Sequence, residues 1–355
     1  MTESGVADPQ PFAGRVGDRR QFLGLDILRF GAALLVALSH LGVASGFGYF
    51  VRGVIGVQMF FILSGFLIAY TGNGLAPAVF LTRRIVRLMP AVWVCASICA
   101  ALALFAGDGV GDVANRYVRT MVLWPAGRWI DGIYWTLIIE CSFYVVVAAG
   151  LWAWGPRSMP RIIMVVGGVS AACWAIRLAV MATGIDLQLE QHVGHFLLLV
   201  FGCHFATGGM LWVCLRDRAT PARLVALAIF AGGVLAQLGY GHRGGAFIFD
   251  AIVLFAFIAA MLVSVRLDPV SRFAPVIRMF GLASYPLYLL HNMLGKALLS
   301  ALTGIPAPVA LAGVLILVTA ISAGIARLVE PPVQRQLRRL LAGVASRRRA
   351  GVLSV

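Results

Sequence analysis

Residues 25–44 read LDILRFGAALLVALSHLGVA, a stretch in which apolar side chains predominate. A helix of about 20 such residues is long enough to cross the hydrocarbon core of a bilayer, which is about 30 Å thick. Its ionisable side chains are Asp26, Arg29 and His40. The stretch therefore predicts a membrane-spanning helix that carries unusual polar groups.

The rest of the chain repeats this pattern. Of its 355 residues, 61% are hydrophobic and 12% are charged, whereas soluble domains average about 25% charged residues. The sequence therefore predicts an all-α polytopic membrane protein with about ten transmembrane helices. The expected spans are Leu25–Ala44, Val54–Tyr70, Pro90–Ala106, Ile133–Trp154, Ile162–Thr183, His195–Leu215, Leu224–Tyr240, Phe247–Val265, Phe280–Leu302 and Val309–Leu328.

The net charge of +15 is unevenly distributed between these spans. Twenty arginines fall on the side of the N-terminus, and the opposite loops hold five, namely Arg52, Arg116, Arg119, Arg128 and Arg243. This bias predicts cytoplasmic N- and C-termini in a bacterial inner membrane. We expect a tail over 1–21, a membrane domain over 22–332 and a basic tail over 333–355 that lies against anionic lipid. The basicity needs no nucleic-acid partner.

Six cysteines fall within the apolar spans: Cys95, Cys99, Cys141, Cys173, Cys203 and Cys214. The residues around them in the sequence supply no complete set of metal ligands. We interpret these cysteines as small core residues and expect neither a metal site nor a tightly bound cofactor.

Ionisable side chains inside a span are costly and are candidate functional residues. Arg29 and His40 are separated by three helical turns with a residual rotation of only about 20°, so they share one helix face about 16 Å apart. Asp26 precedes Arg29 by one turn and can neutralise its guanidinium. The alternative is that Arg29 snorkels to the membrane surface and that His40 is structural.

Arg84 and Arg87 are spaced at i, i+3 just before the span that begins at Pro90. They are compatible with a grip on a phosphate-bearing ligand and equally with ordinary cytoplasmic positive charge. Ser64 and Gly65 lie near the middle of the second span, where small residues permit close helix packing. Taken alone, these two residues indicate packing more than function.

Two further spans carry polar stripes. Glu140 and Tyr144 share a face of the fourth span, and we expect Glu140 at a depth similar to that of His40. A histidine–carboxylate pair is a plausible general base with its orienting partner. Tyr285, Tyr288 and His291 follow helical spacing in the ninth span, and the alternative is that His291 is a structural histidine.

Together these segments resemble the acyltransferase-3 family of bacterial membrane O-acyltransferases, with most likeness to exopolysaccharide and lipopolysaccharide acetyltransferases. The resemblance runs from Leu25 to Pro332, and Gln58 and Thr136 depart mildly from its pattern. It is carried, in family order, by Leu25-Asp26, Arg29…His40, Phe60-Phe61-x-x-Ser64-Gly65-Phe66, Arg84-x-x-Arg87, Trp135…Glu140-x-x-Phe143-Tyr144, Ser284-Tyr285-Pro286-Leu287-Tyr288…His291 and Glu330-Pro331-Pro332.

The resemblance implies ten spans and an acyl-coenzyme A donor, with acetyl-CoA as the expected co-substrate. It implies that His40 is catalytic with Arg29 and Glu140 beside it, and that Arg84 and Arg87 bind the donor together with Ser64 and Gly65. The expected supporting residues are Asp26, Tyr144, Tyr285, Tyr288 and His291. Either direct attack by the acceptor or an acyl-His40 intermediate fits these roles.

The expected acceptor is a hydroxyl group of a cell-surface or exported glycan. A glycolipid or a small hydrophobic metabolite remains an alternative acceptor. A glycan or lipid transporter and a non-catalytic membrane scaffold are the competing function classes. A transporter would usually show repeated halves, and no such repeat is evident in the sequence. The oligomeric state stays open.

Overall fold

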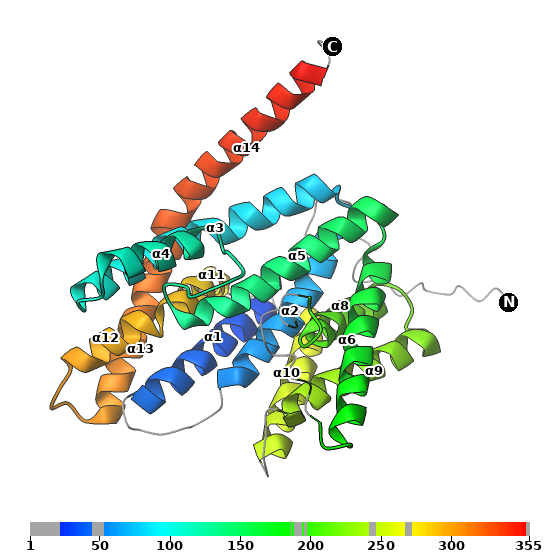
Figure 1. Ribbon diagram of the computed structural model, residues 1–355, viewed down its shortest axis with the longest axis horizontal. Coiled ribbons are helices and arrows are strands. Elements are labelled where there is room, and N and C mark those ends of the chain that lie inside the picture. Colours follow the sequence, from blue (N-terminus) through cyan, green and yellow to red (C-terminus); the bar gives the residue numbers. More distant parts are fainter. Residues whose placement is uncertain are drawn as a thin grey trace.

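The computed structural model describes residues 22–44, 53–185, 187, 194, 197–240, 246–266 and 272–352. The expected tail over 1–21 and the arginines Arg52 and Arg243 lie outside these ranges. Every regular element within them is helical, which confirms the predicted all-α fold (Figure 1). The elements are α1 (Leu23–Ala44), α2 (Gly53–Gly72), α3 (Pro77–Phe105), α4 (Val110–Met121), η1 (Gly132–Tyr134), α5 (Trp135–Trp154), α6 (Met159–Met181), α8 (Gly202–Arg216), α9 (Pro221–Tyr240), α10 (Ala246–Arg266), α11 (Ala274–Leu290), α12 (Met293–Ala301), α13 (Ala307–Gly324), the π-helical turn η2 (Ile325–Val329) and α14 (Glu330–Val352).

Within the described ranges, 8 helices are long and apolar enough to cross a membrane, and α11 is a shorter apolar helix. The chain is thus a multi-pass membrane protein, while ten spans and the orientation of the termini stay predictions. The expected span His195–Leu215 is wrong in its first part, because residues 197–201 form turns and α8 begins at Gly202. Leu198 has a φ of 59° there, a left-handed conformation that a helix cannot continue through.

The expected span Phe280–Leu302 is interrupted. The chain leaves α11 after Leu290, turns at His291 and Asn292, and begins α12 at Met293. Pro286, one turn before the interruption, has no backbone N–H and weakens the helix in which it stands. The hydrophobic pattern alone does not reveal this break, because apolar residues continue on both sides of it.

Helix α3 begins earlier than the sequence pattern indicates. Pro77 occupies the first turn, where its missing N–H costs no hydrogen bond, and the helix continues through Pro90 to Phe105. Arg84 and Arg87 therefore lie inside the helix and not before it. The helix holds both side chains in fixed positions relative to the rest of the bundle.

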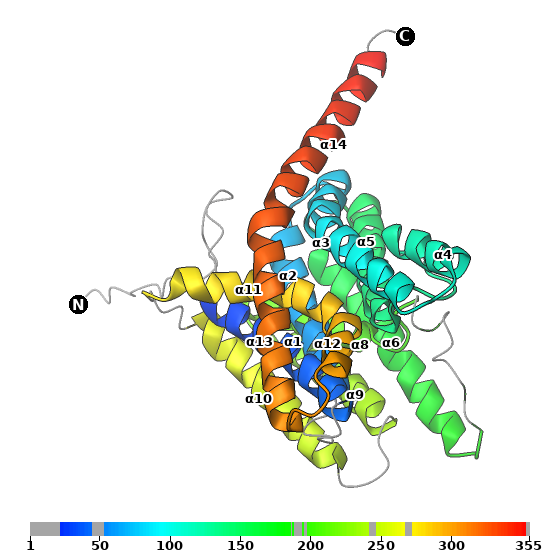
Figure 2. The ribbon, with the colours of Figure 1, turned by 90° about the vertical axis from the view of Figure 1, so that its left-hand side faces the viewer.

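Residues 107–132, which connect the expected spans Pro90–Ala106 and Ile133–Trp154, contain a helix of their own, α4. Its apolar residues recur with helical spacing, so that it packs against α3 (Figure 2). Trp93 of α3 donates its indole N–H to the carbonyl of Met121 at 3.1 Å. The loop therefore folds back along α3.

The C-terminal part of the chain forms one long helical rod. Helix α13 continues through η2 into α14, which projects away from the other helices in both views (Figures 1 and 2). Arg335, Arg338 and Arg339 are exposed on it. The segment expected as a basic tail is therefore helical as far as Val352, and its cytoplasmic location stays a prediction.

Glycines permit the closest helix contacts in the bundle. At the crossing of α2 and α8, a side chain on Gly65 would overlap the backbone of Phe205, and one on Gly208 would overlap the backbone of Ile62. At the contact of α1 with α11, a Cβ on Gly281 would lie 2.5 Å from the Cβ of Asp26. Small residues thus hold α2 and α1 against their neighbours at a backbone-to-backbone distance.

We expect Gly65→Ala to destabilise the protein by about 1–3 kcal/mol, because the added methyl meets rigid backbone. The measurement is the melting temperature of purified protein in detergent. Gly168→Ala on α6 is the matched control, since no atom lies within 4 Å of its added Cβ. Equal melting temperatures for the two variants would contradict the close contact.

Candidate active site

Two histidines from different helices contact each other at one end of the bundle. The Nδ1 atom of His40 on α1 lies 2.9 Å from the Nε2 atom of His291. Their ring planes are nearly parallel, with centroids 5.1 Å apart and an interplanar angle of 18°. His291 is fully buried and His40 is half-buried, so the pair is partly accessible. We call this end of the bundle the histidine end.

The polar contacts continue from the histidine pair into the bundle. The Nδ1 atom of His291 lies 2.7 Å from the carbonyl oxygen of Tyr288, and the hydroxyl of Tyr288 bonds that of Thr136 at 2.9 Å. The ring of Tyr288 also meets Phe60 edge-on at 5.6 Å. Helices α2, α5 and α11 thus converge beneath the histidines.

A small cavity of about 50 Å³ opens between these three helices. Most of its wall is apolar or aromatic, and hydroxyl and carboxylate groups are placed within it. Tyr285 contributes a hydroxyl that is buried without a hydrogen-bond partner among the described residues. The lining residues are Val57, Phe60, Phe61, Ser64, Thr136, Leu137, Glu140, Tyr285 and Tyr288. Such a mixture is typical of sites that bind small organic groups.

Glu140 sits at the deep side of this cavity and is oriented by two hydroxyl groups. Tyr144 donates to its Oε1 atom at 2.6 Å, and Ser64 donates to the same atom at 3.2 Å. The expected pairing of His40 with Glu140 is replaced by the pairing of His40 with His291. The reason is the depth of Glu140 in the bundle. Thr136 is level with Tyr288, whose hydroxyl it bonds, and Glu140 lies one helical turn deeper than Thr136.

The two predicted donor-binding residues on α2, Ser64 and Gly65, face different parts of the bundle. Ser64 lines the cavity, whereas Gly65 faces Phe205 of α8. A donor-binding role for Gly65 therefore stays a prediction, and its direct role is in helix packing.

Charged groups gather at the other end of the cavity, which we call the arginine end. The guanidinium of Arg29 is within electrostatic range of Arg87, Asp26, Glu140 and Tyr144. This places Asp26, the expected partner of Arg29 on its own helix, and Glu140 of α5 around one charge. Because the bundle interior has a low dielectric constant, these interactions are stronger than they would be in water.

Arg84 and Arg87 differ in their surroundings. Arg84 is half-buried, donates a hydrogen bond to the Thr71 hydroxyl, and lies over the rings of Phe80 at 5.3 Å and Tyr144 at 5.8 Å. Arg87 is exposed, and its charge reaches Asp26 and Arg29. The two arginines therefore connect an accessible surface with the residues around Glu140.

Sequence reasoning missed Asp131, which lies beside the histidine pair. Its buried Oδ1 atom accepts hydrogen bonds from the Asn292 amide at 2.7 Å and from the backbone of Ile133 at 3.3 Å. Burial raises the pKa of Asp131, while the bond from Asn292 and the nearby charges of Lys296 and His40 oppose this shift. The sequence feature that could have revealed Asp131 is its position as the capping residue before the short helix η1.

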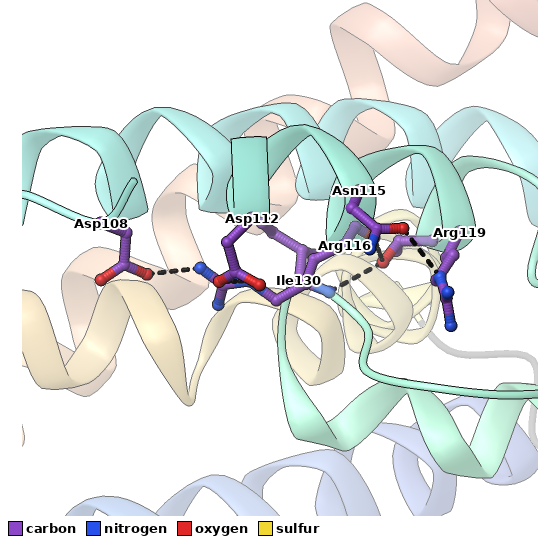
Figure 3. A network of polar contacts seen from close by, with 7 residues as sticks. Asp108, Asp112, Asn115, Arg116, Arg119 and Ile130 are labelled. Carbon is purple, nitrogen blue, oxygen red and sulfur yellow. Dashed lines mark hydrogen bonds and ion pairs between the residues drawn. The ribbon is translucent and has the colours of Figure 1, made fainter. Parts of the chain in front are cut away.

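Hydrogen bonds from α4 hold the segment that carries Asp131 (Figure 3). Thr120 accepts from the backbone N–H of Ile130 at 2.8 Å. Arg116 is buried between Asp108 and Asp112, at 2.5 and 2.8 Å respectively. Helix α4 therefore supports the connecting segment that approaches the histidines.

The described residues contain no group of three or more His, Cys, Asp or Glu side chains that could hold a metal ion. The six cysteines are free thiols.

The model of the acyltransferase-3 family, described as an acyltransferase domain, matches residues 22–327. The chain therefore belongs to this family and is a membrane acyltransferase. It is 25% identical over 319 residues to the peptidoglycan O-acetyltransferase OatA of Listeria monocytogenes, covering 77% of this chain and 49% of that protein. It is 27% identical over 323 residues to the exopolysaccharide production protein ExoZ of Rhizobium meliloti, covering 84% of this chain and 96% of that protein.

The chain thus spans about half the length of the Listeria relative and nearly the full length of the Rhizobium relative. No solved structure is significantly similar to it.

The buried position of Asp131 predicts a pH-dependent stability. Because its folded-state pKa is raised, the stability linked to this group is fully present below the usual aspartate pKa of about 4 and is lost as pH rises through the folded-state value. Asp131→Asn keeps an oxygen that can accept from Asn292 and Ile133 but removes the buried charge. We expect its melting temperature in detergent to rise relative to wild type as pH increases from about 4 to about 8. A difference that does not change with pH would contradict this prediction.

Proposed function

We propose that this protein transfers a short acyl group, preferentially acetyl, from acyl-CoA to a hydroxyl group of a cell-surface or exported glycan. The observation that supports this most is a continuous series of polar groups through the bundle. It runs from Arg84 and Arg87, past Glu140 and the aromatic cavity, to His40 and His291. A donor and an acceptor that approach from opposite ends would meet along this series of groups.

The arginine end suits the phosphate groups of coenzyme A. An arginine presents several N–H donors in a fixed plane and binds phosphate oxygens with charge-assisted hydrogen bonds. Arg87 is exposed for such contacts, and Arg84 is fixed beside Tyr144, next to the cavity. In the proposed orientation this end faces the cytoplasm of a bacterial inner membrane, where acyl-CoA is available.

We place the acyl-transfer step where the cavity approaches His40, which does not itself line the cavity. His40 removes the proton of the acceptor hydroxyl, which is a poor nucleophile until it is deprotonated. The oxygen forms a bond to the thioester carbonyl carbon, the carbon–sulfur bond breaks, and His40 returns the proton to the departing thiolate. The partnerless hydroxyl of Tyr285 and the charge of Arg29 stabilise the negative charge that develops on the carbonyl oxygen.

The proposal of a glycan acceptor rests on the descriptions of the two relatives. One is described as a peptidoglycan O-acetyltransferase and the other as an exopolysaccharide production protein. Both descriptions concern polysaccharides outside the cytoplasm, which matches an acceptor that enters at the histidine end. Comparing the glycans of a deletion strain with those of its parent by mass spectrometry tests the acceptor class, and the proposal expects a loss of acetyl groups.

We expect His40→Ala to lower the rate of transfer from labelled acetyl-CoA to the glycan by at least about 100-fold, the usual contribution of a general base. The assay uses purified protein in lipid nanodiscs, and size-exclusion chromatography verifies folding. His204→Gln is the control, because His204 is also fully buried but stands on α8. Unchanged transfer by folded His40→Ala would remove this residue from the mechanism.

We expect Arg87→Gln to raise the KM for acetyl-CoA about tenfold with little change in kcat, because it removes a charge-assisted contact to phosphate. Arg83→Gln is the matched control, since Arg83 is also exposed on α3, one turn from Arg87. Equal effects of the two substitutions would indicate that only the general positive charge of this surface matters.

A further inference from the structure

We infer that His291 is a positioning residue that fixes the tautomer of His40, so that the Nε2 atom of His40 is the base. This inference rests on the proposed function and deepens it. It assigns His291 a role that a carboxylate often fills in other enzymes. Four atoms on a single path carry the inference: the carbonyl oxygen of Tyr288, the two ring nitrogens of His291, and Nδ1 of His40.

The contact of His291 with the backbone fixes its tautomer. Its Nδ1 atom lies 2.7 Å from the carbonyl oxygen of Tyr288. A carbonyl oxygen only accepts hydrogen bonds, so Nδ1 must carry the hydrogen. A neutral imidazole has one N–H, and Nε2 of His291 therefore has a free lone pair.

The tautomer of His291 in turn fixes that of His40. The Nδ1 atom of His40 lies 2.9 Å from the Nε2 atom of His291. Because that Nε2 atom is an acceptor, Nδ1 of His40 must be the donor. The neutral form of His40 then carries its lone pair on Nε2, which is the atom that can take a proton from the acceptor hydroxyl.

The break between α11 and α12 explains why His291 can act in this way. Tyr288 lies in the last turn of α11, where carbonyl groups are no longer all required by the helix. His291 follows directly as the capping residue, and its backbone N–H still bonds the carbonyl of Leu287 at 3.0 Å. The backbone thus fixes the ring, and full burial prevents water from competing for its nitrogens.

The proton balance is simple. The acceptor O–H bond breaks and the proton moves to Nε2 of His40, whose Nδ1–H then donates more strongly to His291 because the ring is charged. His291 keeps its single hydrogen throughout. When the thiolate leaves, the proton passes from Nε2 of His40 to sulfur.

The kinetic test compares His291→Gln with His291→Phe in nanodiscs, with His204→Gln and His204→Phe as matched buried controls. Glutamine offers a carbonyl oxygen to His40, whereas phenylalanine offers no acceptor. We expect kcat to fall about 100-fold for His291→Phe and less than about tenfold for His291→Gln, with the KM for acetyl-CoA unchanged in both. Retained kcat in folded His291→Phe, or equal losses in both variants, would overturn the inference.

A second measurement does not depend on activity. Nitrogen NMR of protein labelled at its six histidines distinguishes protonated from unprotonated ring nitrogens, and His40→Ala and His291→Phe assign the signals. We expect protonated Nδ1 and unprotonated Nε2 for both residues. The opposite tautomer of His40 overturns the inference even where transfer is intact. The expected tautomers without any transfer would instead contradict the proposed function.

Discussion

The contact between α1 and α11 is the constraint on which the rest of the site depends. At one end of this contact, Gly281 allows the backbone of α11 to approach Asp26. At the other end, His40 meets His291. The absence of a side chain at Gly281 therefore sets the distance between the helices, and that distance allows the two imidazoles to bond. Arg29 lies on α1 between these two points, within electrostatic range of Glu140.

The site divides the polar groups between two helix pairs that have different tasks. The α1–α11 pair holds the histidines, and the α2–α5 pair holds Glu140 with its two hydroxyl donors. Glu140 therefore bonds hydroxyl groups, whereas His40 has the imidazole of His291 as its direct partner. Asp131 then supplies negative charge from outside the pair, within electrostatic range of His40. The positive charge of Lys296 lies within the same range of His40 and opposes the effect of Asp131.

Sequence reasoning found most of the site because polar residues in apolar helices are few and conspicuous. The shared face of Arg29 and His40 and the stripe of Tyr285, Tyr288 and His291 follow directly from helical spacing. The pairing of His40 with Glu140 was wrong because depth was counted along ideal helices from assumed membrane boundaries. Asp131 was missed because it lies in a connecting segment, and its position depends on hydrogen bonds from α4 that no local pattern indicates.

The interruption at His291 has a consequence for how this part of the chain sits in lipid. Helix α12 has 9 residues, a length of about 14 Å, which cannot cross a bilayer without α11. Hydrocarbon offers no hydrogen bonds to a bare bend, so such a bend is stable only where protein encloses it. Helices α1, α3 and α13 pack against α12 and enclose the bend. Packing of these helices therefore stabilises both the bend and the contact that His291 makes there with His40.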